Sequence, residues 1–258
     1  MARAKRHYLP GHVWHITHRC HKKEFLLKLV KDRQRWLYWL FEAKKRYGLR
    51  ILNYMVTSNH VHLLVLNGVE RDTIPRSIQL IAGRTGQEYN QRKNRNGAFW
   101  EYRYHATAVQ TNEHLFKCIT YIDLNMVRAG VVKHPRQWIQ SGYNEIQRPR
   151  QRYGIIDFKS LMALLQVENI VDLKEAHREW IEAVLKKSKV FRESKWTQSI
   201  AVGDKPFLKQ VKDRLGIRAK GRKIDGSEDD AYQLREGQTN YGAWQDLDNN
   251  TFDWNLAN

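Results

Sequence analysis

Cysteines are scarce in this sequence, and other features that would assign a class at once are missing. The two cysteines, Cys20 and Cys118, lie far apart and lack the spacing of a metal site, so they predict two reduced, structural thiols and no disulfide framework. No unbroken apolar run reaches the roughly 18 residues of a membrane-spanning helix, and the basic start of the chain does not lead into the apolar centre of a signal peptide. We therefore expect a soluble, cytoplasmic protein with no membrane partner.

Negative charge is also in short supply. The chain has 27 Asp and Glu residues against 45 Lys and Arg residues, which gives a formal net charge of +18. Eight acidic residues and one basic residue fall in residues 225–258, so this tail carries −7 and residues 1–224 carry +25. Such an excess repels itself in the compact state unless a polyanion lies beside it, and nucleic acid is therefore the predicted partner. The tail is rich in Gly and Asn and is predicted to be poorly ordered.

What the sequence does contain is a regular alternation of strand and helix patterns in its first half. Strands are expected over residues 12–20, 51–56, 61–66 and 102–109. Helices are expected over residues 28–47, 75–93 and 112–127, with Gly48 and Gly130 as stops and Asn112 as an N-cap. The order β-α-β-β-α-β predicts an α+β protein with a ferredoxin-like antiparallel sheet, helices on one face, and one added helix. RNA-recognition modules share this topology, so the fold alone does not decide the function.

The chain is predicted to divide into four segments. Residues 1–146 form the first domain, residues 147–156 a Pro- and Arg-rich linker, residues 157–224 a helical basic region, and residues 225–258 the acidic tail. This division places the functional surface in the first 224 residues, where the positive charge lies.

Within the helical basic region, capped helices are expected to start at Asp157 and Asp172. A short helix over residues 206–216 leads into a basic loop that contains Arg218, Lys220 and Arg222. Such a helix suits contact with a DNA backbone, although a solvated surface helix with a basic end gives the same pattern.

The stretch Ser58-Asn-His60-Val-His62 carries the first candidate site. Side chains alternate between the two faces of a strand, so His60 and His62 point to the same side, about 6–7 Å apart at their Cα atoms. Neutral imidazole is the commonest side-chain metal ligand, and two of them on one face can reach one cation. Alone, the pair is a weak signal, because a chain with 11 histidines can contain it by chance.

The second candidate element is the predicted helix that contains Tyr121 and Asn125. These residues are four positions apart and share one helix face, whereas Ile119, Ile122 and Met126 lie on another face and can serve the core. By itself the pattern equally describes a packed tyrosine and a polar surface residue.

Together the two elements resemble a known family. His60-Val-His62 resembles the paired histidines of the HUH single-strand endonucleases. Residues 121–130, Tyr-Ile-Asp-Leu-Asn-Met-Val-Arg-Ala-Gly, resemble the tyrosine helix of the Y1 transposases, and specifically of the REP-associated tyrosine transposases (RAYTs). Residues 10–17 and 99–106 also resemble family stretches, and residues 188–223 resemble, less specifically, the C-terminal part of longer members. Met126 stands where the family usually has proline, and Met is expected to let the helix continue without a break.

The resemblance implies a metal-dependent single-stranded DNA endonuclease and strand transferase that acts on REP-type hairpin repeats. Tyr121 would be the nucleophile and would form a 5′-phosphotyrosine, while His60, His62 and the amide oxygen of Asn125 would hold Mg²⁺ or Mn²⁺. The resemblance also favours a monomer that acts in cis at the bacterial nucleoid, whereas related transposases are dimers that exchange the tyrosine helix.

Basic and aromatic residues alternate around residues 95–105, a mixture that suits the stacking of unpaired bases against a basic groove. Core packing is the alternative role for the aromatic members. The candidate DNA-binding residues are Arg95, Trp100, Arg103, Tyr104, His105, Arg128, Arg218, Lys220 and Arg222.

Histidines also recur at every third position from His12 to His21. On a strand they would alternate between the two faces, so one ion could not gather all four, and no metal site is predicted there. Two other functions remain open. A non-catalytic repeat-DNA or RNA binding protein would be expected to carry stacking aromatics where residues 60–66 have histidines and aliphatics. A phosphodiesterase that uses water as its nucleophile would need more clustered carboxylates than the chain offers.

Overall fold

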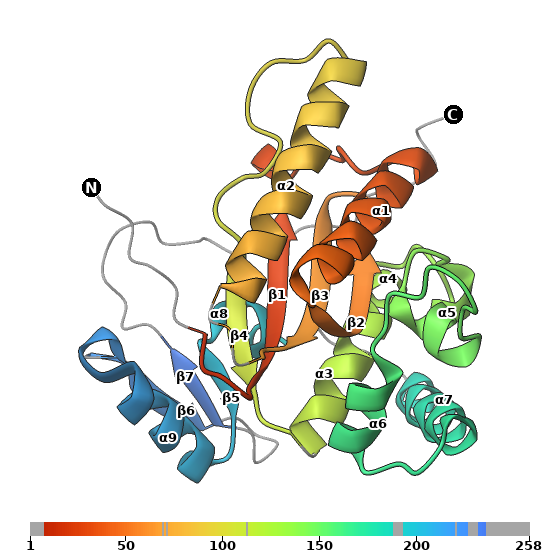
Figure 1. Ribbon diagram of the computed structural model, residues 1–258. Coiled ribbons are helices and arrows are strands. Elements are labelled where there is room, and N and C mark those ends of the chain that lie inside the picture. Colours follow the sequence, from red (N-terminus) through yellow and green to blue (C-terminus); the bar gives the residue numbers. More distant parts are fainter. Residues whose placement is uncertain are drawn as a thin grey trace.

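The computed structural model describes residues 8–68, 70, 72–111, 113–187, 193–219, 221–226 and 232–235. Its centre is an antiparallel sheet in the order β2-β3-β1-β4. These strands are β1 (Val13–Arg19), β2 (Arg50–Val56), β3 (His60–Leu66) and β4 (His105–Val109). The helices α1 (Val30–Tyr47) and α2 (Thr73–Arg92) pack side by side over one face (Figure 1). The predicted α+β, ferredoxin-like fold is confirmed.

Local sequence explains where these elements end. Gly48 caps α1, and its N–H donates to the carbonyl of Lys44. Its φ of 64° is a left-handed backbone conformation that costs glycine less free energy than any other residue. Residues 57–59 form the tight turn between β2 and β3. The strand predicted over residues 102–109 is shorter than expected, because regular pairing with β1 begins only at His105.

The two faces of β1 have different neighbours. Ile16 and His18 line a small cavity with Trp36 of α1 and Ile78 of α2, so the even-numbered residues of this strand face the helices. His15, which has the opposite parity, faces the other side of the sheet together with His62 of β3. The apolar core therefore fills the helix face, and the polar site described below lies on the opposite face.

The third predicted helix is broken, contrary to the expectation that Met126 would let it continue. It consists of α3 (Glu113–Asp123) and α4 (Asn125–Arg128), separated at Leu124 with φ −84° and ψ 6°. Leu124 is buried in a small separate apolar cluster with Tyr143 and Ile181, and this packing accompanies the change of direction. The proposed N-cap Asn112 lies outside the described residues.

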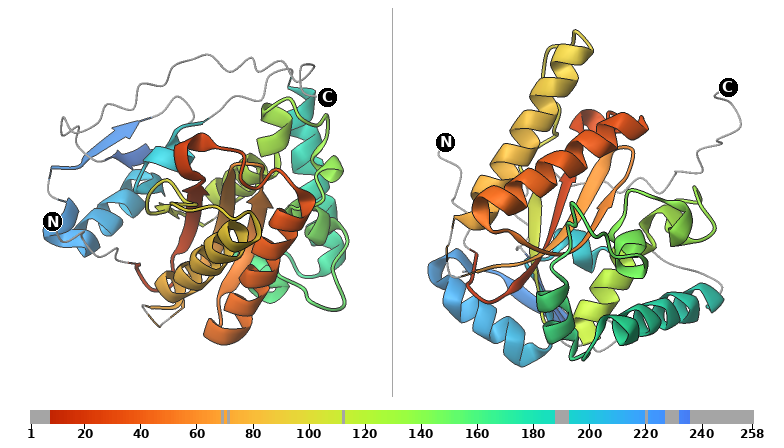
Figure 2. Two further views of the ribbon diagram at one scale, coloured as in Figure 1. Left: turned by 90° about the horizontal axis from the view of Figure 1, so that it is seen from above. Right: turned by 45° about the vertical axis from the view of Figure 1, so that its right-hand side comes forward.

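The chain then crosses to the β2 edge of the sheet, where α5 (Gly142–Gln147), α6 (Phe158–Leu165) and α7 (Ile170–Lys186) pack (Figure 2). The segment predicted as a linker is held at its end, because the N–H groups of Ile155 and Ile156 donate to the buried Glu145 carboxylate. Asp157 caps α6 as predicted, accepting from the N–H of Ser160. The next helix begins earlier than the sequence suggests, because Asn169 rather than Asp172 is its N-cap.

The rest of the chain extends the other edge of the sheet, so the region predicted to be helical also contains strands. After α8 (Lys195–Gln198), strand β5 (Ala201–Gly203) pairs in parallel with β4. Beyond α9 (Lys205–Leu215), β6 (Lys223–Gly226) and β7 (Tyr232–Arg235) complete a seven-stranded sheet in the order β2-β3-β1-β4-β5-β7-β6. The predicted disorder of the acidic tail is wrong for β7, whose Leu234 is fully buried. The remaining tail residues after 235 lie outside the described ones.

Both cysteines are free and buried, as expected of structural thiols. Burial raises the pKa of Cys20 to about 12 and that of Cys118 well above its usual value, so both thiols stay protonated. Within the part of the chain that the structure describes, no helix is both long and apolar enough to cross a membrane.

Candidate catalytic site

Two neighbouring strands place three histidines on the face opposite α1 and α2. In the register of β1 and β3, Thr17 lies opposite His62, so His15 is the diagonal neighbour of His62 on the same face. His60 follows the turn at residues 57–59, on the same strand as His62 and two positions before it. The predicted same-face arrangement of His60 and His62 is present, with ring centroids 4.9 Å apart.

The imidazole of His62 is the centre of a chain of polar contacts. Its Nδ1 lies 2.9 Å from His15 Nε2, and its Nε2 lies 3.0 Å from the amide nitrogen of Asn125. His15 Nδ1 in turn lies 2.9 Å from the carbonyl oxygen of Trp196 in α8. His60 is tied separately to the turn before it, with its Nδ1 2.7 Å from Asn59 Oδ1.

Burial keeps the two inner histidines neutral. Removal from water lowers the pKa of His62 well below its usual value, and the neighbouring His60 and His15 lower it further. Burial also lowers the pKa of His15 to about 3, against a smaller opposing effect of its bond to the Trp196 carbonyl. Neutral imidazole is the form that binds a metal ion, so these rings are in the protonation state that a metal site requires.

Tyr121 lies beside the histidines despite the break in its helix. Its ring centroid is 5.9 Å from that of His62 and 6.1 Å from that of His15. The guanidinium of Arg128 sits over the ring at 4.0 Å and donates to the main-chain carbonyl of Tyr121. Trp196 closes the other side, with its ring 6.1 Å from that of Tyr121, and only 4% of Tyr121 is exposed.

This arrangement offers two imidazoles and one amide beside a phenol. Among the described residues, no group of three His, Cys, Asp or Glu side chains is arranged to hold a metal ion. A cation at His60 and His62 would therefore need oxygen ligands of another kind, which an amide or a phosphate supplies. Asn125 directs its nitrogen at His62 Nε2, so the amide must turn over before its oxygen can serve as a ligand. The donor set fits a divalent cation on these terms.

The predicted DNA-binding residues fall into separate groups. Arg128 belongs to the site itself, and His105 at the start of β4 binds the carbonyl of Ser199 at 2.9 Å, next to α8. Arg103 is exposed just before β4, and Tyr104 beside it is half-buried. His105 lies opposite Thr17 in the register and therefore faces the side that carries His62, whereas the Tyr104 ring lies 6.1 Å from that of His18, which faces the helices.

Other candidates have structural contacts. Trp100 stacks on His18 at 4.1 Å and donates to the carbonyl of Ala82, which supports the core-packing alternative. Arg95 pairs with Glu24 at 3.6 Å.

The C-terminal candidates are not brought to the histidines by any described contact. Arg222 is half-buried before β6, near the far edge of the sheet. Lys220 and the side chain of Arg218 lie outside the described residues.

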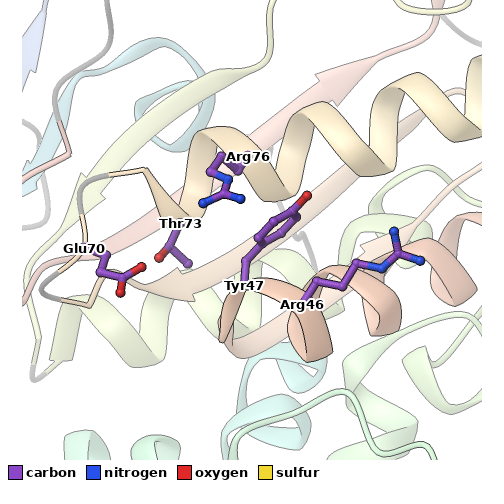
Figure 3. A pocket seen from close by; sticks show the side chains of 5 residues that line it. All are labelled: Arg46, Tyr47, Glu70, Thr73 and Arg76. Carbon is purple, nitrogen blue, oxygen red and sulfur yellow. The ribbon is translucent and has the colours of Figure 1, made fainter.

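A separate pocket of about 210 Å³ lies between the C-terminal end of α1 and the N-terminal end of α2. It is lined by Arg46, Tyr47, Glu70, Thr73 and Arg76. The Arg76 guanidinium stands over the Tyr47 ring at 4.7 Å (Figure 3). None of the predicted site residues lines this pocket, and we assign it no role.

Sequence reasoning did not find His15 and Trp196 as members of the site. The sequence presents His15 only as one of four regularly spaced histidines, and the structure places His15 and His18 on opposite faces of β1, as strand alternation predicts. One sequence signal could have identified His15. In the strand next to the one that carries His60 and His62, strand alternation puts its side chain on the same face of the sheet as theirs. Trp196 carries no such signal, since only folding brings α8 to β1.

Comparison with known proteins gives these features a context. Residues 10–125 match the family model described as IS200-like transposase. None of the curated proteins matches the chain. Among solved structures, the chain is similar to a REP-associated tyrosine transposase bound to a REP hairpin, with 19% identity, a TM-score of 0.48, and coverage of 61% of this chain and 95% of that one. It is also similar to a protein from Deinococcus radiodurans R1 that is provisionally assigned as a transposase, with 17% identity, a TM-score of 0.33, and coverage of 44% and 89%.

Proposed function

We propose that this chain, whose residues 10–125 match the family model described as IS200-like transposase, cleaves single-stranded DNA with Tyr121 as its nucleophile. One observation carries the assignment: Tyr121 and Asn125, from two short helices, both meet His62 of β3. The ring of Tyr121 is 5.9 Å from that of His62, and the Asn125 amide is 3.0 Å from its Nε2. A nucleophile and candidate ligands thus share one place on the sheet.

The proposed step is a transesterification at phosphorus. Tyr121 Oη forms a bond to the scissile phosphorus, and the bond from phosphorus to the 3′ oxygen of the preceding nucleotide breaks. The products are a 5′-phosphotyrosine and a free 3′-OH, which takes up the proton that the phenol releases. Because the covalent bond conserves the phosphodiester, the reverse attack by a 3′-OH can join strands, which suits transposition.

Arg128 is placed to support this step. Its guanidinium lies 4.0 Å from the Tyr121 ring, so its charge can stabilise the phenolate as it forms and the phosphate that approaches it. Its bond to the Tyr121 carbonyl fixes the turn between α3 and α4 at the same time.

His60, His62 and, after its amide turns over, Asn125 are the residues that would hold a divalent cation, Mg²⁺ or Mn²⁺. When bound there, such a cation supplies Lewis acidity toward a phosphate oxygen. The two imidazoles, which β3 holds in place, and the amide of Asn125 on α4 would bind and orient it.

A single-stranded, hairpin-forming DNA is the proposed substrate, and a REP-type repeat is the specific form. The excess of +25 over residues 1–224 supports a polyanionic partner, and the sequence resemblance to RAYTs supports the hairpin. The same resemblance supports a monomer that uses its own tyrosine. Since Tyr121 is 4% exposed and packs beside Trp196, some of the side chains around it must rearrange before a phosphodiester can reach its hydroxyl.

That burial is also the observation that favours a second function, a repeat-DNA or RNA binding protein without chemistry. Incubation with a hairpin oligonucleotide and Mn²⁺ separates the two. We expect a covalent protein–DNA adduct that survives denaturing electrophoresis and disappears with EDTA. Salt-sensitive binding without any adduct, unchanged by EDTA, would instead establish the binding protein.

A further inference from the structure

We infer that His15 is a positioning residue that holds His62 in the tautomer with its lone pair on Nε2, and that the C-terminal segment at Trp196 fixes His15 in turn. This inference rests on the proposed function in so far as His62 is a metal ligand. It concerns a residue of β1 and a segment beyond residue 125, neither of which belongs to the paired histidines or to the tyrosine helix. The rings of His15 and His62 lie nearly parallel, with centroids 5.1 Å apart and an interplanar angle of 10°.

The direction of the first bond follows from the chemistry of a carbonyl. The main-chain oxygen of Trp196 can only accept, so His15 Nδ1 carries the hydrogen and donates to it at 2.9 Å. Thr107 Oγ1 donates to the Ser199 carbonyl at 2.6 Å and lies 3.2 Å from the Trp196 oxygen, which secures the end of α8 against the sheet. A neutral ring with hydrogen on Nδ1 has its lone pair on Nε2.

The direction of the second bond follows from the first. His15 Nε2 must accept, so His62 Nδ1 donates to it at 2.9 Å. His62 Nε2 then holds the lone pair, and it accepts from the amide nitrogen of Asn125, a group that can only donate, at 3.0 Å. The three hydrogen bonds therefore run in one direction: Asn125 donates to His62, His62 donates to His15, and His15 donates to the carbonyl of Trp196.

His60 reaches the same state through a different neighbour. Its Nδ1 donates to Asn59 Oδ1 at 2.7 Å, and Asn59 in turn donates from its amide nitrogen to the carbonyl of Lys23 at 3.3 Å, which leaves the oxygen to face His60. Both proposed ligands therefore present Nε2 as the metal-binding atom before any cation arrives. Such outer partners ordinarily fix the ring and raise its basicity as a ligand.

Removal of His15 has a definite chemical consequence. His62 Nδ1 would lose its acceptor, and an imidazole side chain left to itself in water prefers the form with hydrogen on Nε2. That form could still donate to the Asn125 oxygen, but it would present a proton where a cation needs a lone pair. The C-terminal segment thus influences the proposed metal site through the main-chain carbonyl of Trp196 and the imidazole of His15.

The test compares two substitutions of His15 in the full-length protein. His15→Phe keeps a flat ring and removes the acceptor, whereas His15→Gln retains an acceptor oxygen at the end of a chain of similar reach. We measure the His62 tautomer by ¹⁵N NMR without metal, with its signals assigned by their loss in His62→Ala, and Mn²⁺ affinity by electron paramagnetic resonance. His12→Phe is the control, because His12 Nδ1 binds the Pro10 carbonyl at 3.0 Å and its ring stacks on Phe207 instead of His62.

We expect hydrogen on His62 Nδ1 in the unmodified protein and on Nε2 in His15→Phe. Mn²⁺ affinity should fall by about 10- to 100-fold in His15→Phe, the usual effect of losing an outer partner, and recover to within a few-fold in His15→Gln. Hydrogen on Nε2 in the unmodified protein overturns the inference, even if His15→Phe fails to fold. Equal Mn²⁺ affinity in folded His15→Phe overturns it as well. Failure of the proposed function has a different signature, which is the absence of a DNA adduct with an intact Nδ1–H tautomer and Mn²⁺ bound.

Discussion

The Oδ2 atom of Asp123 lies 2.7 Å from Nε2 of His177, and neither side chain is more than 1% exposed. This bond joins the last residue of α3, two positions after Tyr121, to α7 on the β2 side of the sheet. The remaining polar atom of each side chain also has a partner. Asn53 donates to Asp123 Oδ1 at 3.1 Å, and Gln147 donates to His177 Nδ1 at 2.9 Å. The end of the tyrosine helix is thus anchored by a fully satisfied buried network.

Asp123→Asn should break this anchor. The new amide nitrogen must face one of the two donors, Asn53 or His177, so we expect a loss of about 3 kcal/mol in the free energy of unfolding, as for other broken buried pairs. Urea denaturation measures it. The control is Glu175→Gln on α7, a side chain 60% exposed in an ion pair with Arg178, which should change stability by less than about 0.5 kcal/mol. Equal effects of the two substitutions would remove Asp123 from its anchoring role.

Substitution of either paired histidine should abolish tight cation binding. In His60→Ala and His62→Ala we expect Mn²⁺ affinity to fall by more than about 100-fold, because loss of an outer partner alone ordinarily costs about 10- to 100-fold. Electron paramagnetic resonance of free Mn²⁺ measures the affinity directly. His134→Ala removes a histidine that pairs with Glu182 at 3.1 Å, and its Mn²⁺ affinity should be unchanged. Retention of affinity in both site variants would show that the cation binds elsewhere.

Asn125 is expected to contribute an oxygen ligand after its amide turns over. Asn125→Ala should weaken Mn²⁺ binding and slow adduct formation, whereas Asn125→Asp keeps an oxygen, adds a negative charge, and should bind Mn²⁺ at least as tightly. Titration with Mn²⁺ and the initial rate of adduct formation measure the two effects. If the alanine variant matches the unmodified protein in both, the third ligand is not Asn125.

Arg103 lies exposed before β4 and is expected to contact a DNA phosphate. Arg103→Ala should weaken hairpin binding and reduce the slope of log affinity against log salt by about 1, the value for one lost phosphate contact. Fluorescence anisotropy at several salt concentrations gives that slope. Arg178→Ala serves as the matched control, because Arg178 is 57% exposed on α7 at the other side of the sheet. An unchanged slope in Arg103→Ala would place the DNA path away from β4.

Much of the first domain could be predicted because its signals are local. The alternation of apolar residues along a strand fixes which face His60 and His62 share, and Gly48 ends α1 because its backbone can adopt a positive φ. The same periodicity, summed over seven elements, was enough to give the order of strands and helices and hence the topology.

The remaining parts of the fold depend on contacts between residues far apart in the sequence. Leu124, at the break between α3 and α4, packs against Tyr143 and Ile181, and no local sequence pattern predicts these contacts. Strand β5 has only three residues and exists because β4 offers it an edge. His15 and Trp196 are 181 positions apart, so their bond could not be inferred from either neighbourhood.

The most direct test of the account is the location of the covalent bond to DNA. Mass spectrometry of the trapped adduct should map the nucleotide to the peptide that contains Tyr121, and Tyr121→Phe, which removes only the hydroxyl, should give no adduct and no cleavage. Tyr102→Phe, at a tyrosine that is 63% exposed, should form the adduct normally. Normal cleavage by Tyr121→Phe, or an adduct mapped to another tyrosine, would contradict the assignment of Tyr121 as the nucleophile.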